Sequence, residues 1–292
     1  MPGPTLGVVF RPQLAPERLR GVVEAADSSG LDELWLWEDC FLEGGVSAAA
    51  MALAWSERVR VGVGLFPVPL RNPAIVAMEL ATLTRAFPGR FRFGLGHGVQ
   101  DWMAQVGARA ASPLTLLREY ATTVRGLLAG ETVTVRGDYV QLTEVSLGWP
   151  PDGPPEVLIG ASGPKTLELS GSVGDGTILT AGTSVVRLGW ARERIDAGRS
   201  AANRSEPHRV VLNLLAARGS MPRERAHAEL AGEEVDDVTV SGDAESIAAG
   251  VRRWAAAGAD TVVLQPLAGE PDVEGFVRFT AEQVAPLVRE GW

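Results

Sequence analysis

The sequence predicts an α/β protein folded as a single (β/α)8 barrel over residues 1–292. Short apolar runs typical of β-strands alternate with amphipathic helical segments along the chain, and strands separated by helices pair in parallel. The alternation contains eight strand–helix units, the number that closes a barrel in about 250 residues or more. An open, doubly wound sheet is the alternative, but the first strand–helix turn, Phe10–Gln13, lacks the glycine-rich phosphate-binding pattern of that fold.

The predicted strands are short runs that are mostly apolar or β-branched and are bounded by turn residues. They are Thr5–Phe10, Leu31–Trp37, Val59–Leu65, Arg90–Gly96, Glu156–Gly160, Gly176–Thr180, Arg209–Ala216 and Asp260–Gln265.

The predicted helices carry apolar residues at three- and four-residue spacing on one face. In Pro16–Ser29, Leu19 and Val23 share such a face, Pro16 suits the first turn, and Gly30 suits the stop. The other predicted helices are Ser47–Ser56, Pro73–Phe87, Pro113–Ala129, Pro164–Val173, Ser184–Ala202, Ala244–Ala257 and Val273–Arg289.

The segment Glu131–Leu142 interrupts this alternation after the fourth predicted helix. Val133 and Val135 alternate with polar residues, and Gly137 followed by Asp138 is a turn signal. We therefore expect a small inserted β-hairpin at this point.

The composition indicates which partners the chain can bind. Lys and Arg total 27 against 36 Asp and Glu, and the net charge of −9 disfavours sequence-independent binding of nucleic acid. One cysteine, Cys40, and three scattered histidines supply neither a disulfide framework nor a cluster of metal ligands. The sequence shows no membrane-spanning run and no signal-peptide pattern. We expect a cytoplasmic protein without a metal, a membrane or a nucleic-acid partner, which binds a small molecule.

Polar and glycine residues follow several predicted strands, where a (β/α)8 barrel builds its active site. Glu38 and Asp39 follow the second strand, and His97 lies between Gly96 and Gly98 after the fourth. Because a partly dry pocket raises the pKa of a carboxyl group, Glu38 and Asp39 are candidates for an acid, a base or a hydrogen-bonding pair. His97, between two glycines, is a candidate to donate a proton or to contact a ring. The alternatives are that Glu38 pairs with an arginine of a neighbouring loop, and that His97 has no chemical role.

The fifth predicted helix begins without a capping side chain. Two other helices are preceded by Asn72 and Ser112, whose side-chain oxygens can accept from the free amides, whereas Gly163 has no such oxygen. A free helix N-terminus suits a phosphate. Ser162 and Lys165, the single lysine of the chain, would add a hydroxyl and a charge. The alternative is an ordinary loop in which glycine allows close packing.

Several segments match one known family. They are Trp35–Asp39, Val61–Leu65, Arg71–Ala74, Phe93–Gly98, Ser112–Leu114, Gly160–Leu167 and Gly174–Gly176. Together they resemble the luciferase-like monooxygenase superfamily, in particular the branch that uses the deazaflavin coenzyme F420. The resemblance covers nearly the whole chain. Its most specific part is Gly-Pro-Lys-Thr-Leu followed by Asp-Gly, which is typical of the deazaflavin branch.

The resemblance implies a barrel with F420 at the carboxyl rim, hydride transfer to or from a substrate carbon, and a homodimer. It also implies a bulge after the third strand with a non-proline cis peptide at Gly64–Leu65. On this basis the expected cofactor contacts are Gly64, Leu65, Gly96, His97, Gly160, Ala161, Ser162, Gly163, Pro164 and Lys165.

One departure from the family bears on the reaction. Many relatives carry Asp-His after the second strand, and alcohol-oxidising members use that histidine, whereas this chain has Glu38 and Asp39. The resemblance therefore favours a reductase of C=C or C=N bonds, with Asp39 or His97 protonating or positioning the substrate. The alternatives are an FMN-dependent monooxygenase and a non-catalytic cofactor-binding relative. Apolar residues near the predicted rim suggest a substrate with apolar surface, and the alternative is that any of them belongs to the core; they are Trp37, Phe41, Phe66, Trp102 and Met103.

Overall fold

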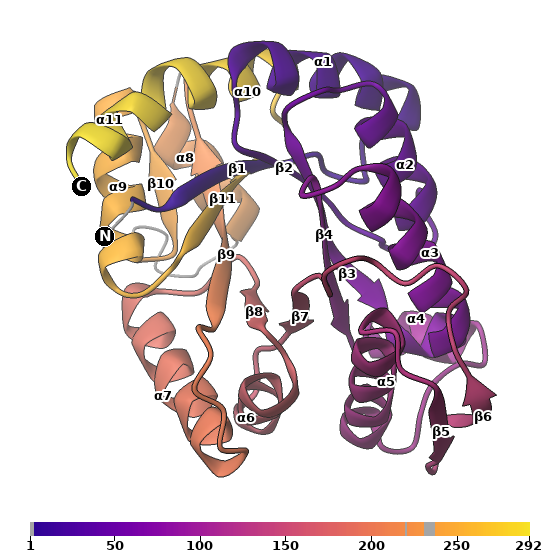
Figure 1. Ribbon diagram of the computed structural model, residues 1–292. Coiled ribbons are helices and arrows are strands. Elements are labelled where there is room, and N and C mark those ends of the chain that lie inside the picture. The colour runs from indigo at the N-terminus through magenta and orange to yellow at the C-terminus, as the bar shows by residue number, and fades with distance from the viewer. Residues whose placement is uncertain (1–2, 220, 231–236) are drawn as a thin grey trace.

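Eight parallel strands form a closed barrel surrounded by helices in the computed structural model, which describes residues 3–219, 221–230 and 237–292 (Figure 1). The order round the barrel is β1, β2, β3, β4, β7, β8, β9 and β11. Pairing of β11 with β1 and of β8 with β9 completes the ring. The predicted (β/α)8 barrel is confirmed.

The barrel strands coincide with the predicted ones to within a few residues. They are β1 (Thr5–Val9), β2 (Glu33–Leu36), β3 (Arg60–Pro67), β4 (Phe91–Gly96), β7 (Val157–Gly160), β8 (Gly176–Leu179), β9 (Arg209–Ala217) and β11 (Thr261–Pro266). Their inward side chains form an apolar cluster inside the barrel, which includes Val9, Trp35, Leu158, Ile178, Val211 and Val263. A larger cluster fills the layer between the barrel and the helices.

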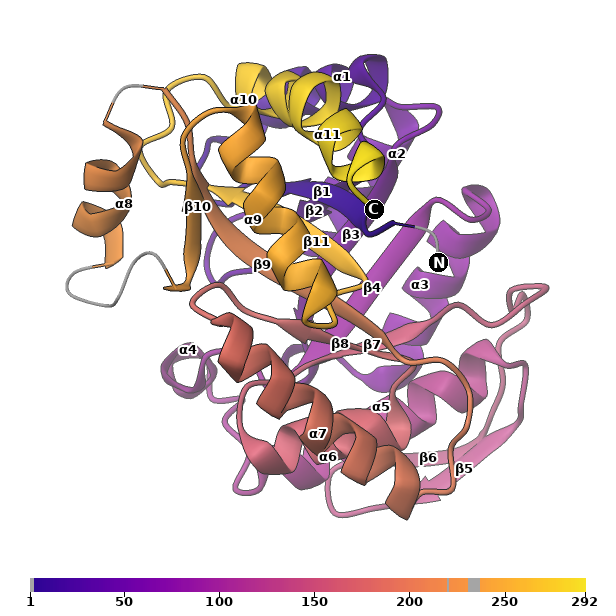
Figure 2. The same ribbon diagram turned by 90° about the vertical axis from the view of Figure 1, so that its left-hand side faces the viewer.

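The helices surround the barrel on its outer face (Figure 2). They are α1 (Leu19–Ser29), α2 (Gly45–Ala54), α3 (Pro73–Ala86), α4 (Gln100–Gln105), α5 (Pro113–Leu128), α6 (Pro164–Val173), α7 (Val185–Ala201), α8 (Pro222–Leu230), α9 (Ala244–Ala256), α10 (Val273–Phe279) and α11 (Ala285–Glu290). A π-helical turn, Thr280–Val284, separates α10 from α11 where one helix was predicted. Pro286 explains it, because proline cannot donate the backbone hydrogen bond of a regular helix. None of the described helices is long and apolar enough to cross a membrane.

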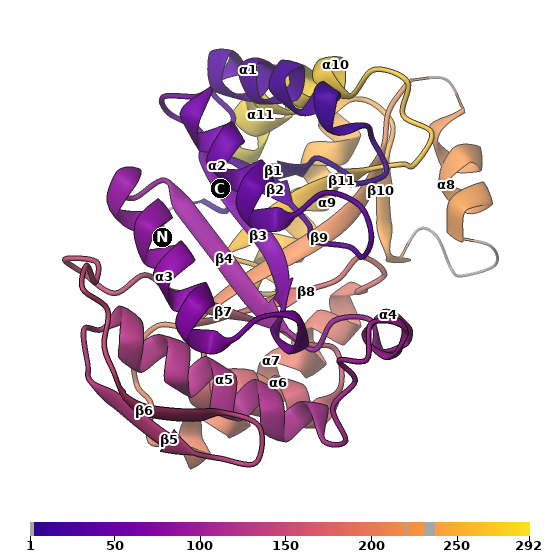
Figure 3. The same ribbon diagram turned by 90° about the vertical axis from the view of Figure 1, so that its right-hand side faces the viewer.

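The helix α4 and the strand β10 (Thr239–Ser241) were not predicted from the sequence, and α8 is the polar helix that contains His227. The strand β10 pairs with residues 215–217 of β9, beyond the stretch of β9 that pairs with β8. Figures 2 and 3 show α4 and α8 at one end of the barrel, away from both chain termini. Since α4 follows β4 and α8 follows β9, this is the end at which the barrel strands finish.

A two-stranded antiparallel sheet lies between α5 and β7 in the chain and packs outside the barrel (Figure 3). Its strands are β5 (Val133–Arg136) and β6 (Gln141–Val145). The strand β5 lies within the interrupting segment Glu131–Leu142, and β6 begins within it and ends beyond it. Glu119 of α5 secures its turn, because this carboxylate accepts hydrogen bonds of 2.9 Å from the backbone amides of residues 138, 139 and 140.

The strand β3 contains the irregularity that the resemblance implied. Its register with β4 shifts between Val63 and Phe66, and the Gly64–Leu65 peptide bond is cis, so both implied features are confirmed. A second cis peptide joins Cys40 to Phe41 in the loop after β2, and the sequence did not predict it.

Candidate active site

A cavity of about 530 Å³ opens at the carboxyl ends of the barrel strands. Its size is typical of a pocket for a small molecule or part of a cofactor. Residues predicted for the site that line this cavity are Glu38, Asp39, Gly64, Leu65, His97, Gly160, Ala161 and Ser162. The barrel therefore brings together groups that are far apart in the sequence.

The remaining predicted residues lie beside the cavity without lining it. Gly96 is buried in β4, and Gly163, Pro164 and Lys165 form the start of α6, where Lys165 is exposed to solvent. Any contact between Lys165 and a ligand must therefore occur outside the cavity mouth.

The side chain of Leu65 explains two of the glycines. A Cβ atom on Gly160 would lie 2.1 Å from Cδ2 of Leu65, and a Cβ atom on Gly96 would lie 2.5 Å from the same atom. Glycine at these two positions therefore makes room for Leu65, which forms an apolar surface on the β3 side of the cavity. Such a surface can support one face of a flat ring.

Glu38 is bound on both carboxylate oxygens. Arg71 donates to Oε1 through Nη1 and to Oε2 through Nη2, the latter at 2.7 Å, and the amide of Gly45 donates to Oε2 at 2.7 Å. The Glu38 side chain is only 7% exposed. This is the arginine pairing that the sequence left open as the alternative to a proton-transfer role.

The carboxyl group of Asp39, unlike that of Glu38, makes no hydrogen bond with another described residue. Burial raises the pKa of Asp39, and the positive charge of Arg11 offsets part of that rise. Glu43, in the same loop, was missed by the sequence reasoning. Burial, helped by the negative charge of Asp39, raises the pKa of Glu43 to about 7. The loop after β2 therefore holds two carboxyl groups that retain protons more readily than usual.

His97 contacts Thr166 of α6, with Nε2 3.2 Å from the hydroxyl oxygen Oγ1. Burial lowers the pKa of His97, so the ring is neutral at pH 7. A neutral imidazole can donate or accept a hydrogen bond, but it is a weaker proton donor than a protonated carboxyl group. Asp39 is therefore the stronger candidate.

The start of α6 has the free amides that the sequence predicted. Asn72 caps α3 by accepting from the amide of Ala74 at 2.9 Å, and Ser112 caps α5, whereas Gly163 makes no side-chain cap. Arg187, at the start of α7, lies next to this point and donates from Nη2 to the carbonyl of Ser162 at 2.7 Å. The sequence reasoning missed Arg187, because only the fold brings α7 beside the loop before α6.

The predicted apolar rim is only partly correct. Trp37 and Trp102 line the cavity. Phe66 and Met103 are instead buried in the protein core, and Phe41 is 64% exposed outside the cavity. Strand and helix periodicity point Phe66 and Met103 away from the opening, which a position near a strand end does not reveal.

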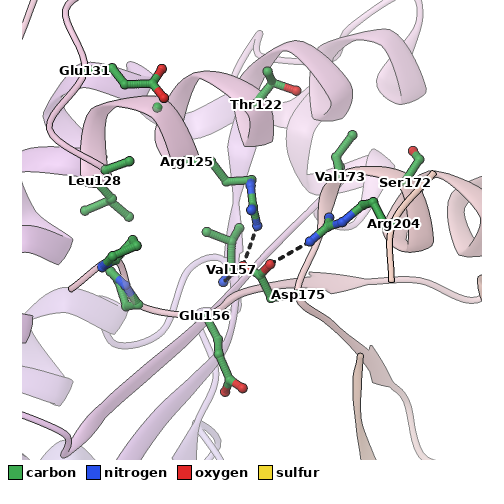
Figure 4. A pocket seen from close by; sticks show the side chains of 14 residues that line it. Thr122, Arg125, Leu128, Glu131, Glu156, Val157, Ser172, Val173, Asp175 and Arg204 are labelled. Atoms are coloured by element: carbon green, nitrogen blue, oxygen red, sulfur yellow. Dashed lines mark hydrogen bonds and ion pairs between the residues drawn. The ribbon is translucent and has the colours of Figure 1, made fainter. Parts of the chain in front are cut away.

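A second cavity, of about 540 Å³, lies at the opposite end of the barrel (Figure 4). Asp175 lies at its centre between two arginines, accepting from Arg125 through Nη1, from Arg204 at 2.8 Å and from the amide of Val157 at 2.9 Å. Burial alone would raise the pKa of Asp175, but these hydrogen bonds outweigh it and hold the pKa below its ordinary value. The charges of Asp175, Arg125 and Arg204 are thus paired within the protein. No group of three or more possible metal ligands occurs among the described residues.

Residues 6–221, which make up more than half of the chain, match the luciferase-like monooxygenase family.

The chain belongs to the luciferase-like monooxygenase family.

The curated relatives of this family member include a 5,10-methylenetetrahydromethanopterin reductase and an F420-dependent glucose-6-phosphate dehydrogenase. It is 30% identical over 244 residues to a 5,10-methylenetetrahydromethanopterin reductase of Methanolobus tindarius, a match spanning 83% of this chain and 73% of the relative. It is 32% identical over 185 residues to an F420-dependent glucose-6-phosphate dehydrogenase of Beutenbergia cavernae, spanning 58% of this chain and 54% of the relative. These relatives place it in the F420-dependent branch.

Solved structures share its fold. An F420-dependent secondary alcohol dehydrogenase, in complex with an F420–acetone adduct, superimposes with a TM-score of 0.88 at 21% identity, covering 99% of this chain and 100% of that one. The coenzyme F420-dependent tetrahydromethanopterin reductase of Methanopyrus kandleri gives 0.83 at 18% identity, covering 97% and 99%. At these identities the likeness shows the barrel fold alone.

Proposed function

We propose that this luciferase-like family member is an F420-dependent oxidoreductase that reduces a C=C or C=N bond of a small organic molecule. The observation that carries the proposal is the cavity itself, which has the Leu65 surface on one side and the uncapped start of α6 beside it. A ring and an anionic tail joined in one molecule fit these two features. The F420-dependent relatives support the same cofactor.

The residues present fit F420 at both ends. The Leu65 side chain would support the ring, and Ala161, Ser162 and the free amides of α6 would hold the phosphate-bearing tail, with Lys165 and Arg187 supplying positive charge. A deazaflavin carries carbon where a flavin carries N5, so bound F420 supplies two-electron hydride chemistry and not oxygen activation.

Asp39 is the residue proposed to complete the reduction. Its carboxyl group lines the cavity, has no hydrogen-bond partner among the described residues, and retains a proton more readily than usual because it is buried. Asp39 would give this proton to the second atom of the double bond when the first carbon accepts the hydride. Glu38 would position the loop through its ion pair with Arg71 and would not transfer a proton.

A homodimer is also part of this proposal. The outward faces of α2 and α3 expose Met51, Ile75 and Met78, with exposures of 38%, 48% and 51%. Exposed apolar residues on consecutive helices are typical of a surface covered by another subunit. Size-exclusion chromatography with light scattering tests this, and a monomer at micromolar concentration would contradict it.

Side-by-side titration of the purified protein with F420 and FMN, followed by fluorescence, tests the cofactor assignment. We expect F420 to bind at least tenfold more tightly than FMN, and the bound F420 to exchange a hydride with an activated alkene under anaerobic conditions. Preferential FMN binding with oxygen consumption would instead identify a monooxygenase. Tight F420 binding without hydride exchange would identify a non-catalytic relative.

A further inference from the structure

Two buried carboxamides in the cavity have no partner in the protein. Asn213 of β9 and Gln265 of β11 are only 5% and 8% exposed, and both line the cavity. Neither side-chain amide makes a hydrogen bond with another described residue, and none of their polar atoms is sealed from solvent. The accessible part of each side chain therefore faces the cavity.

The two side chains form one polar wall. Asn213 pairs with Val263 across the β9–β11 ladder, so Gln265 lies two residues further along on the same inward face. In the ring of strands, β9 is four positions from β3 in either direction, which places it on the opposite side of the barrel. The carboxamides therefore lie across the barrel from the strand that carries Leu65, whose side chain extends over β4 and β7, with Asp39 after β2 at one side.

Neither amide has a partner among the described residues, so only solvent or a ligand in the cavity can form hydrogen bonds with them, which is unfavourable compared with an apolar side chain at the same position. A buried polar group without a hydrogen bond costs free energy, and the great majority of such groups in proteins are paired. The apolar cluster next to these positions, which includes Val211, Val263 and Ile178, would pack more favourably against apolar residues. A ligand that fills the space and hydrogen-bonds both amides accounts for them.

The rest of the lining restricts what that ligand can be. Lys and Arg do not occur among the described residues that line the cavity, and the carboxylates there are Glu38 and Asp39. A phosphate ester would therefore enter without a paired cation among the lining residues, at a large desolvation cost. Trp37, Trp102 and Ile178 add apolar surface. These features together favour an uncharged molecule.

We propose that Asn213 and Gln265 are the substrate-recognition pair, and that the substrate is an uncharged molecule carrying a carbonyl or amide group on an apolar skeleton. A carboxamide both donates and accepts hydrogen bonds, so the pair can bind a carbonyl oxygen or a whole amide edge. This proposal rests on the proposed function, since it assigns the Leu65 side of the cavity to F420 and the opposite side to the substrate.

The test compares the near-isosteric variants Asn213→Leu and Gln265→Met with the unmodified protein. In the absence of ligands both variants should melt at a higher temperature, because an amide that has no partner among the described residues is replaced by an apolar group. The control is Thr177→Val, whose buried hydroxyl contacts Nε2 of His208 at 2.8 Å and should lower the melting temperature when removed. A fall in melting temperature for both carboxamide variants would show a structural role and overturn the proposal.

Ligand binding supplies the second readout. Both variants should bind F420 within twofold of the unmodified protein, whereas cyclohexanone, observed by saturation-transfer NMR on the F420-loaded protein, should bind about three- to tenfold more weakly. Glucose 6-phosphate should not bind the loaded protein at all. A tenfold loss of F420 affinity in the variants, or binding of glucose 6-phosphate in preference to cyclohexanone, would contradict the assignment.

Failure of the proposed function and failure of the substrate assignment give different experimental results. In that case the unmodified protein does not bind F420, and the substrate assignment falls with it. If the unmodified protein binds F420 tightly but the loaded protein does not bind cyclohexanone, the cofactor assignment stands and the substrate class proposed here is wrong.

Discussion

Arg71 holds Glu38 in a two-pronged ion pair that ties together the segments following β2 and β3. The Nη2–Oε2 distance is 2.7 Å, Nη1 contacts Oε1, and the Gly45 amide at the start of α2 adds a hydrogen bond to Oε2. The pair is largely shielded from water, with the Glu38 side chain 7% and the Arg71 side chain 25% exposed. It therefore positions the loop that carries Asp39 at the cavity.

Removal of Arg71 should destabilise the folded protein, because Glu38 would remain buried without its ion-pair partner. We expect Arg71→Met to lower the free energy of unfolding by about 3 kcal/mol, because Glu38 is left as an unpaired buried charge. Urea denaturation followed by circular dichroism measures the change. The double variant Glu38→Leu with Arg71→Met should recover most of the loss, and a single variant as stable as the unmodified protein would show that the pair is weak.

Asp39→Asn should slow anaerobic reduction of an activated alkene by roughly 100-fold, because the amide cannot give up the proton that the carboxyl group supplies. Since burial raises the pKa of Asp39, the rate of the unmodified enzyme should fall as pH rises through that value, and the variant should lose this dependence. Asp101→Asn, an exposed carboxylate at the start of α4, is the matched control. Unchanged rates and pH profile in Asp39→Asn would exclude Asp39 as the proton donor.

Gly160→Ala should weaken F420 binding by displacing Leu65. The new Cβ would lie 2.1 Å from Cδ2 of Leu65, and because that atom ends a flexible side chain, it can move into the cavity. We expect at least a tenfold increase in the dissociation constant for F420 with little change in melting temperature. Gly189→Ala, where an added Cβ meets nothing within 4 Å, is the control. Equal F420 affinity in Gly160→Ala would show that Leu65 does not contact the ring.

Lys165→Ala should weaken F420 binding several-fold and leave the melting temperature nearly unchanged, because Lys165 is exposed and its charge would act on the cofactor tail. The loss should shrink at high salt, since ions screen exposed charges. Arg187→Ala should behave in the same way, and Arg194→Ala on the same helix serves as the control. Fluorescence titration at two salt concentrations measures all three, and unaltered dissociation constants would refute the tail assignment.

His208 should make the protein less stable in acid. Burial, together with the charges of Arg199, Arg192 and Arg204, lowers the pKa of His208 to about 4. Between pH 6.5 and 4 the unfolded chain therefore binds a proton at His208 more tightly than the folded protein does. The contribution of neutral His208 to the free energy of unfolding is fully present above pH 6.5 and is lost as the pH falls towards 4.

We expect His208→Gln to reduce the loss of unfolding free energy between pH 7 and pH 4.5, by an amount on the order of 1–3 kcal/mol. Chemical denaturation across this range measures it. His227→Gln, an exposed histidine on α8, is the control. If the free energy of unfolding falls equally between pH 7 and pH 4.5 in His208→Gln and in the unmodified protein, other groups cause the acid sensitivity.

The strands and most helices could be predicted because their signals are local. An apolar run such as residues 209–216, or a proline preceded by a capping residue such as Asn72, indicates an element without reference to the rest of the chain. The elements that were missed are short. The helix α4 has six residues and β10 has only three, so their formation depends on the neighbouring chain.

By itself the sequence determined the barrel, the location of the candidate site at the carboxyl ends of the strands, and the free start of α6. Each of these follows from patterns within one segment or from the alternation of segments. Only the tertiary structure decided that Arg71 pairs with Glu38, that Arg187 approaches Ser162, and that Asn213 and Gln265 share one wall. These relationships join residues far apart in the chain, and closure of the barrel determines which side chains face each other.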